Sequence, residues 1–179
     1  GLLWYTLLLL KHLNGNKMKL IKLGLISLIV LGIIVTLIGL LFPSTVLVSR
    51  AVDIKAPIDS IKYRVGNMEQ WKGWIAGMND ASVKINSATD AQLGNTHVQI
   101  SSITDSSVVS TWTSLNGQVQ LSTIRIIGNS SQDYAVVQWQ FVQHIGWYPW
   151  DRFGSMMNDK IMGTMMEQNL QSLKKSLEQ

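Results

Sequence analysis

The chain has 179 residues, of which 46% are hydrophobic, and it carries a formal net charge of +4 at pH 7. This length accommodates one domain of ordinary size and a membrane segment, but not two independent cores. The excess charge comes from Lys11, Lys17, Lys19 and Lys22, because the region after Phe42 holds 11 basic and 11 acidic residues. That balanced region has no basic stripe for phosphate contacts, so we expect no nucleic acid among the partners.

The sequence contains no cysteine, which excludes disulfides, thiolate metal sites and cysteine nucleophiles. His12, His97 and His144 do not have a spacing typical of metal ligands. A nucleophile elbow, a phosphate loop and a dinucleotide-binding glycine pattern are all absent from the sequence. We therefore expect no metal and no cofactor, and the sequence identifies no catalytic residue.

The segment from Leu23 to Phe42 is a run of 20 residues without a charge. A helix of this length spans the hydrocarbon core of a bilayer, which is about 30 Å thick. Only Ser27 and Thr36 interrupt the aliphatic residues, so the run lacks the polar face of a buried core helix. A cleaved signal peptide is the alternative, but its apolar region is shorter, and no small-x-small site follows Leu40. We expect an uncleaved, single-pass transmembrane helix.

We divide the chain into a basic N-terminal flank at 1–19, a transmembrane helix at 20–42 and one folded domain at 43–179. Lysines are more numerous before the helix than after it, which predicts a cytoplasmic N-terminus and an extracytoplasmic domain. The apolar stretch at 2–10 is too short to cross a membrane. Met18 would serve as a natural start, in which case the residues before it are not native.

The domain begins with a strand, two short helices and then further strands. Residues 45–55 alternate between apolar and polar positions, which is typical of a half-buried strand. Pro57 predicts a helix start, because proline at the first helical position loses no needed hydrogen bond. Gly66 ends this helix. Asn67 followed by Gln70 resembles a capping box, so we expect a second short helix there.

Short β-rich runs follow, and the links between them are too brief for crossover helices, so we expect antiparallel strands. Asn116-Gly117 is a two-residue hairpin signal, and residues 128–131 predict another tight turn. An amphipathic helix ends the chain, with an apolar stripe from Met157 to Leu177 that needs the sheet as its covering surface. The expected strands after the short helices are residues 82–86, 96–103, 108–115, 118–127 and 134–142.

This order of elements resembles the helix-grip fold of the START-like polyketide cyclase/dehydrase superfamily, also called SRPBCC. Val48 to Pro57 resembles the family's opening strand and helix entry, Asn67 to Trp74 its aromatic second helix, and Asn169 to Lys175 its closing helix. The resemblance runs from about Val46 to the C-terminus. It implies an α+β fold with a curved antiparallel sheet of six to seven strands, two short helices and a long C-terminal helix. We recognise six strands, so we expect a shortened or lost hairpin between residues 86 and 108.

The resemblance also implies an interior space between the sheet and the last helix, where members of the family bind lipids, sterols or polyketides. We therefore expect a membrane-tethered module for a small hydrophobic or amphipathic, lipid-like ligand, with the bilayer as its other partner. Apolar side chains at core spacing more often simply pack, so each position also has that interpretation. The candidate cavity residues, all expected on inward faces, are Trp71, Trp74, Trp112, Val137, Trp139, Phe141, Met157, Ile161 and Met165.

Three aromatic residues, Trp147, Tyr148 and Trp150, lie at the entry to the last helix. They can form a gate over the cavity mouth, lie at the bilayer surface where Trp and Tyr are enriched, or pack over the sheet. The sequence does not decide among these three interpretations.

Two other functions stay open at this point. One is a non-catalytic protein-interaction module with a closed cavity, whose partner the sequence does not identify. The other is an enzyme of the cyclase, dehydrase or hydrolase kind, by family analogy alone. Its candidate residues would be His97, His144, Asp151 and Asp159, although a carboxylate near a helix N-terminus usually only complements the helix dipole.

Overall fold

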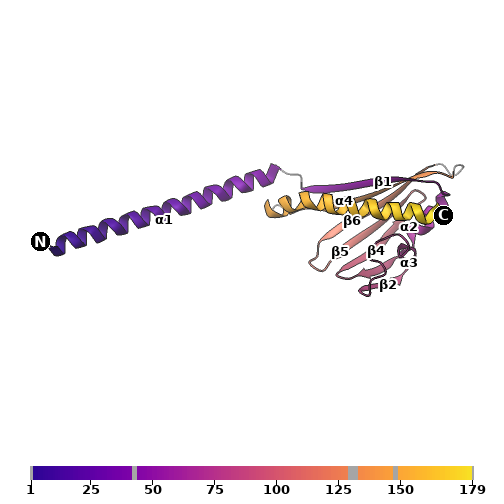
Figure 1. The fold of residues 1–179 in the computed structure, drawn as a ribbon, viewed down its shortest axis with the longest axis horizontal. Helices are drawn as coiled ribbons and strands as arrows, with labels where there is room; N and C mark the ends of the chain where they lie inside the picture. The colour runs from indigo at the N-terminus through magenta and orange to yellow at the C-terminus, as the bar shows by residue number, and fades with distance from the viewer. Residues whose placement is uncertain (1, 42–43, 129–132, 147–148, 179) are drawn as a thin grey trace.

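The long N-terminal helix α1 (Leu2–Leu41) extends away from the rest of the chain, in which a curved sheet wraps the C-terminal helix α4 (Pro149–Leu177) (Figure 1). Part of α1, Lys17–Leu41, is long and apolar enough to cross a membrane, and nearly all of it is exposed. The part of the predicted uncharged span that the structure describes, Leu23 to Leu41, therefore lies within one continuous helix. This computed structural model describes residues 2–41, 44–128, 133–146 and 149–178.

Within the described residues, seven strands form one antiparallel sheet in the order β1-β7-β6-β5-β4-β3-β2. The last strand along the chain pairs with the first, from Thr45 opposite His144 to Ile54 opposite Ala135. This pairing brings the beginning of the domain beside its end. The strands are β1 (Thr45–Ile54), β2 (Val83–Ser87), β3 (Asp90–Leu93), β4 (Thr96–Ile103), β5 (Ser107–Ser114), β6 (Val119–Gly128) and β7 (Ala135–His144).

Alternation along β7 shows which face of the sheet is buried. Ala135, Val137, Trp139 and Phe141 are buried, while the side chains between them are half exposed. Successive side chains of a strand point to opposite faces, so these four residues define the inner face. The helix α4 covers this face along β1, and it supplies the fully buried side chains Met166, Leu170 and Leu173.

The short helices α2 (Ile58–Gly66) and α3 (Met68–Trp71) cover the end of the sheet that lies far from α1 (Figure 1). Asn67 caps α3, because its Oδ1 accepts a hydrogen bond from the backbone N–H of Glu69 at 2.9 Å. The side chain of Gln70 does not return the bond. Its Nε2 lies 3.4 Å from the hydroxyl of Tyr63 instead, so the predicted capping box is half formed.

The hairpin that was expected to be shortened or lost between residues 86 and 108 is not lost, because β3 is present and pairs with both β2 and β4. Its four residues include one buried apolar side chain, Ala91, which lies opposite Ile85 on β2 and Val98 on β4. A strand this short has too few residues for the alternation of apolar and polar side chains to be recognised in the sequence. The sheet therefore has its full set of strands at this edge.

The turn at Asn116-Gly117 joins β5 to β6 as predicted, but it is longer than a two-residue connection. The backbone N–H of Gly117 donates to the carbonyl of Ser114 at 2.9 Å, and the N–H of Ser114 donates to the carbonyl of Gln118 at 3.0 Å. Gly117 has a φ of +80°, whereas Asn116 has no positive φ. These features indicate a three-residue loop with glycine in the left-handed position. The other predicted tight turn falls largely at 129–132, outside the described residues.

The expectation that Met157, Ile161 and Met165 face inward is wrong. Their side chains are 70%, 67% and 39% exposed, whereas Met166 is fully buried. Nine residues at 3.6 residues per turn place Met157 on the opposite side of α4 from Met166. The helix thus has two apolar stripes. One faces the sheet, and the other, which we call the outer stripe, faces away and comprises Trp150, Met157, Ile161 and Met165.

Candidate functional site

Five of the residues predicted to line a cavity, Trp71, Trp74, Trp112, Trp139 and Phe141, pack against one another on the inner face of the sheet. Stacked rings of Trp71 and Trp112 have centroids 6.1 Å apart, and the ring of Phe141 lies 5.4 Å from that of Trp112. The ring centroid of Trp139 lies 5.5 Å from that of Phe141 and 5.6 Å from that of Trp74. The centroids of Trp74 and Trp71 are 6.2 Å apart. These contacts form a closed circuit, which we call the aromatic cluster.

Each indole of the aromatic cluster has an acceptor for its N–H. Trp71 donates to the carbonyl of Val65 at 2.9 Å, and Trp74 donates to that of Arg64 at 3.3 Å. Trp112 and Trp139 donate to the hydroxyls of Ser110 and Ser122, at 3.0 and 2.8 Å. A satisfied N–H fixes the orientation of a buried ring, so the cluster is a rigid part of the core.

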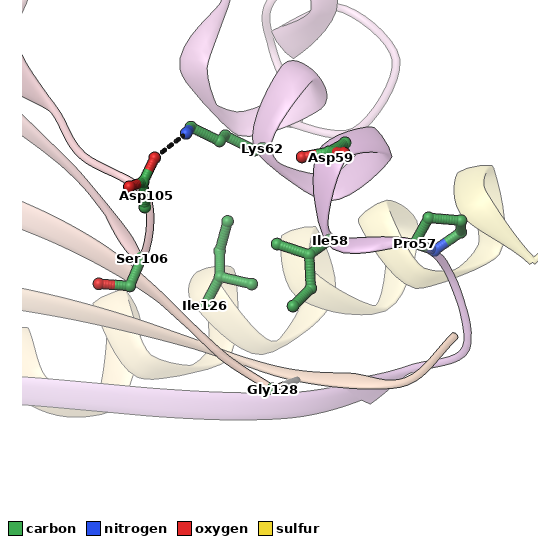
Figure 2. A pocket seen from close by; sticks show the side chains of 8 residues that line it. All are labelled: Pro57, Ile58, Asp59, Lys62, Asp105, Ser106, Ile126 and Gly128. Atoms are coloured by element: carbon green, nitrogen blue, oxygen red, sulfur yellow. Dashed lines mark hydrogen bonds and ion pairs between the residues drawn. The ribbon is translucent and has the colours of Figure 1, made fainter. Parts of the chain in front are cut away.

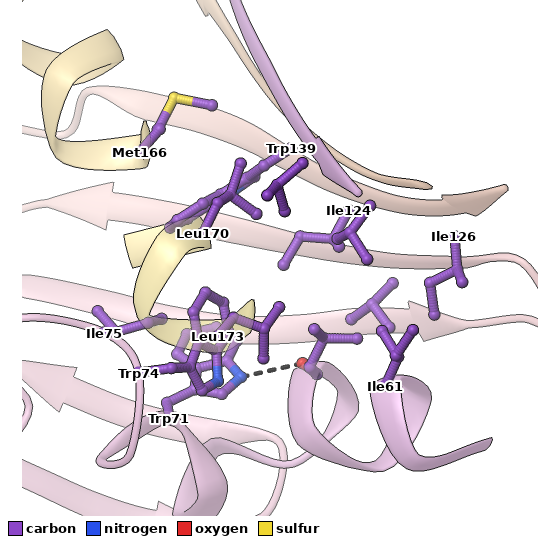
Figure 3. Close-up of a cluster of buried hydrophobic side chains, with 14 of the residues drawn as sticks. Ile61, Trp71, Trp74, Ile75, Ile124, Ile126, Trp139, Met166, Leu170 and Leu173 are labelled. Carbon is purple, nitrogen blue, oxygen red and sulfur yellow. Dashed lines mark hydrogen bonds between the residues drawn. The ribbon is translucent and has the colours of Figure 1, made fainter. Parts of the chain in front are cut away.

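Three members of the aromatic cluster, Trp71, Trp74 and Trp139, lie beneath α4, where a cavity was expected (Figure 3). Trp71, Trp74 and Trp139 are at most 2% exposed, and Ile75 and Leu173 pack beside them. Val137, the other inward residue of the prediction, is also fully buried. Contact of these side chains with a ligand stays a prediction. Trp147 and Tyr148 fall outside the described residues, and Trp150 is 68% exposed in the first turn of α4.

A cleft of about 420 Å³ opens between α2 and the far end of the sheet (Figure 2). Ile58 from α2 and Ile126 from β6 form its apolar floor, and Pro57 lies at one side. Lys62 reaches across from α2 to Asp105, in the turn between β4 and β5. The remaining lining residues are Asp59, Ser106 and Gly128.

Charge in the cleft is unbalanced toward negative. Lys62 Nζ lies 2.9 Å from Asp105 Oδ1, and the hydrogen bond and charge of this ammonium lower the pKa of the Asp105 carboxyl. The Asp105 side chain is fully exposed, so the pair itself adds little stability. Asp59 forms no ion pair among the described residues, and its carboxylate is the charge of the cleft that Lys62 leaves unbalanced.

The cleft has no signal in the sequence beyond the helix entry predicted at Pro57. Lys62 and Asp105 are 43 residues apart, and each looks like an ordinary surface charge. The two meet because the β4–β5 turn lies at the same end of the sheet as α2. A second, shallower hollow of about 320 Å³ lies on the other side of α2, against the C-terminal end of α4, and is lined by residues that include Tyr63, Arg64 and Ser176.

Among the candidate residues of the enzyme hypothesis whose side chains are described, His97 and His144 do not come together. His97 lies on the outer face of β4, where its Nε2 is 2.7 Å from Asp90 Oδ2. Hydrogen bonds from Asn86 and His97 lower the pKa of Asp90. His144 ends β7, three strands away, and its Nδ1 is 3.4 Å from the Thr45 hydroxyl.

The side chains of Asp151 and Asp159 lie outside the described part of the chain. Among the residues that the structure does describe, no group of three or more His, Cys, Asp or Glu side chains could hold a metal ion.

No family model matches the sequence, and no curated protein matches it. Solved structures do match the fold. A START superfamily protein from Mycobacterium smegmatis has a TM-score of 0.54 and 17% identity, over 74% of this chain and 97% of that one. A point mutant of a Thalictrum norcoclaurine synthase, in complex with a transition state analogue, has a TM-score of 0.56 and 11% identity, over 74% and 94%. CalU16 from Micromonospora echinospora has a TM-score of 0.51 and 14% identity, over 73% and 80%.

At these identities the similarity concerns the fold alone. The chain has the START-like helix-grip fold that its sequence predicted, with an apolar helix added at the N-terminus. Because one fold hosts many activities, the function has to be argued from the site.

Proposed function

We propose that this protein is a membrane-tethered module that binds a small amphipathic molecule in the cleft between α2 and the sheet. The cleft itself is the observation that carries the proposal, because it combines an apolar floor with a few polar groups at its rim. The START-like fold supports it, since a neighbour of the same fold is described in complex with a small molecule. The apolar helix α1 supplies the tether.

The chemistry of the cleft favours a ligand that carries a positive charge. Ile58 and Ile126 offer apolar contact area, while the ammonium of Lys62 is neutralised by Asp105. Asp59 then leaves one carboxylate for which a bound ligand would provide the counter-charge. We expect a short aliphatic or aromatic amine to bind better than a carboxylate of the same size.

A nuclear magnetic resonance titration tests the proposal on the full chain in phosphatidylcholine nanodiscs. Octylammonium should shift the methyl signals of Ile58 and Ile126 saturably, and leave that of Ile85 on the distant strand β2 unchanged. Octanoate, which has the same chain length and the opposite charge, should bind more weakly. The Asp59→Asn substitution should remove this preference.

A pair of tryptophan substitutions provides the control. Ser106→Trp fills the cleft and should abolish the saturable shift, whereas Gln99→Trp on the exposed outer face of β4 should preserve it. Non-saturable shifts at Ile58 and Ile126, or equal binding by the Ser106→Trp and Gln99→Trp variants, would contradict the proposal.

The tether defines the second half of the proposal. Lysines before the membrane span favour a cytoplasmic N-terminus, which would place the domain and its cleft outside the cytoplasm. Protease added to sealed cells should then remove the domain without breaking the membrane. Protection of the domain from protease in intact cells would show the opposite orientation, with the domain in the cytoplasm.

The aromatic cluster favours a second candidate function, a non-catalytic interaction module. Rings that fill the interior and have their N–H groups satisfied leave less room for a ligand beneath α4. This candidate predicts a defined cross-linked partner in native membranes together with no octylammonium binding. Octylammonium binding without a cross-linked partner would exclude it.

A further inference from the structure

The end of the domain next to α1 is built from four separate segments. The beginning of β1 and the end of β7 pair there, at Thr45 and His144. The β5–β6 hairpin joins them because β6 begins at that end of β7. The first turns of α4 also lie there and contact α1 (Figure 1). We call this surface the proximal end.

Apolar side chains project from the proximal end. Leu115 in the hairpin is 78% exposed and Val119 at the start of β6 is 53% exposed. The first part of the outer stripe of α4 adds Trp150 at 68% and Met157 at 70%. These residues come from elements that are distant in sequence, so one local irregularity does not explain their exposure. Apolar groups that gather on a soluble surface generally mark a site of interaction.

The hairpin at the proximal end also lacks charge. From Ser106 to Ile124 the chain contains no acidic residue, lysine or arginine. Removing a charge from water is costly, whereas a surface of Leu, Val, Ser, Asn and Gln can enter an interface at low cost. Such a surface fits the boundary between water and lipid, where apolar and neutral polar groups are both accommodated.

The connection to α1 brings this surface to the bilayer. Only residues 42–44 separate Leu41, the last residue of α1, from Thr45, and even a fully extended link of this length covers only about 14 Å. The domain therefore stays close to the point where the helix would leave the membrane. Contact between α1 and α4 holds the same end of the domain toward that point.

We propose that the proximal end rests on the bilayer surface, with Leu115, Val119, Trp150 and Met157 inserted among the lipid head groups. This inference depends on the tether included in the proposed function. The partner is the lipid of the membrane that α1 spans. Ile161 and Met165 continue the outer stripe away from α1, so they mark where contact with lipid fades along α4.

Site-specific fluorescence tests this inference, and the absence of natural cysteine makes the labelling clean. Single cysteines replace Leu115, Val119 and Met157 in the full chain, and each carries an environment-sensitive dye. The proteins are placed in phosphatidylcholine vesicles that contain lipid with a nitroxide on the head group. We expect severalfold stronger quenching at these three positions than at Ile127→Cys.

Ile127 is the matched control because it is an exposed apolar residue at the other end of β6, eight positions from Val119 and about 27 Å away. Val30→Cys, in the middle of the apolar span, reports on the tether through quenching by lipid with a nitroxide on the acyl chain. Quenching at Val30 without quenching at the hairpin and Met157 would overturn the surface contact and leave the tether intact. No quenching at Val30 would overturn the tether and this inference together.

The same labelled positions identify the other possible occupant. If a second copy of the chain covered the proximal end, Met157→Cys would form disulfide-linked dimers and the hairpin labels would stay unquenched. That result would assign the surface to self-association and overturn the membrane contact.

Discussion

At the scale of single residues, the side chain of Arg50 explains why position 163 is a glycine. Arg50 lies on the inner face of β1, between the buried residues Val48 and Val52, and its Nε donates to Glu167 Oε1 at 2.6 Å. Its guanidinium crosses α4 directly over Gly163, where a Cβ would collide with it. A glycine in the middle of a helix is therefore explained by a cation that passes between the helix and the sheet.

The sign of a Gly163→Ala effect should depend on Arg50. In the natural chain the methyl group displaces the guanidinium, and we expect the free energy of unfolding to fall by about 1 kcal/mol. In an Arg50→Ala background the space is open, and the higher helix propensity of alanine should raise stability by about 1 kcal/mol. Urea unfolding followed by tryptophan fluorescence measures both. Gly154→Ala is the control, since nothing lies within 4 Å of its Cβ position, and it should stabilise in both backgrounds.

At the scale of secondary-structure elements, the pairing of β6 with β7 positions the aromatic cluster. Ser122 lies opposite Phe141, and its hydroxyl accepts the indole N–H of Trp139 with both side chains about 1% exposed. One neutral hydroxyl thus orients the ring that joins Trp74 to Phe141. The polar residue is buried because the cluster needs an acceptor inside the sheet.

Ser122→Ala should leave the Trp139 N–H buried without an acceptor, which costs about 1–3 kcal/mol of unfolding free energy. Ser110→Ala is the matched change on β5. It should lower the unfolding free energy by less. The Trp112 ring, whose N–H donates to the Ser110 hydroxyl, is only partly buried, so water can replace the hydroxyl. Thermal or urea unfolding decides between them. If the unfolding free energy falls equally in the two variants, the hydrogen bond to Trp139 contributes no more than the bond to Trp112.

At the scale of the whole molecule, the apolar helix α1 and the cleft lie at opposite ends of the structure. β1 begins next to α1 and runs for ten residues, or about 33 Å, toward Pro57 and the cleft. The cleft therefore opens far from the point where α1 would leave a bilayer (Figure 1). A ligand would reach it from the aqueous phase and not directly from the supporting membrane.

This separation predicts that ligand binding does not need the tether. A chain that lacks residues 1–42 should bind octylammonium with the same affinity as the full chain in nanodiscs, as measured by calorimetry. The methyl spectrum of the shortened chain establishes that its domain is folded. A folded domain with lost or weakened binding would show that the membrane contributes to the site.

Several features were determined by the sequence because they depend on neighbours along the chain. The uncharged run before Phe42 specifies an apolar helix, and the alternation from Ala135 to Phe141 specifies a half-buried strand. Gly117 marks a hairpin, since its left-handed backbone suits a tight turn. The order of these elements, together with the local matches to the START-like superfamily, predicts the helix-grip fold.

Tertiary structure alone decided which apolar face of α4 is buried and what the cleft contains. Met157 and Met166 are both methionines of the same helix. Only packing against the sheet makes one of them exposed and the other buried. Lys62 and Asp105 meet across 43 residues, and Arg50 and Glu167 across 117. Contacts between residues so far apart follow from how the sheet curves around its helix, which no local pattern of residues encodes.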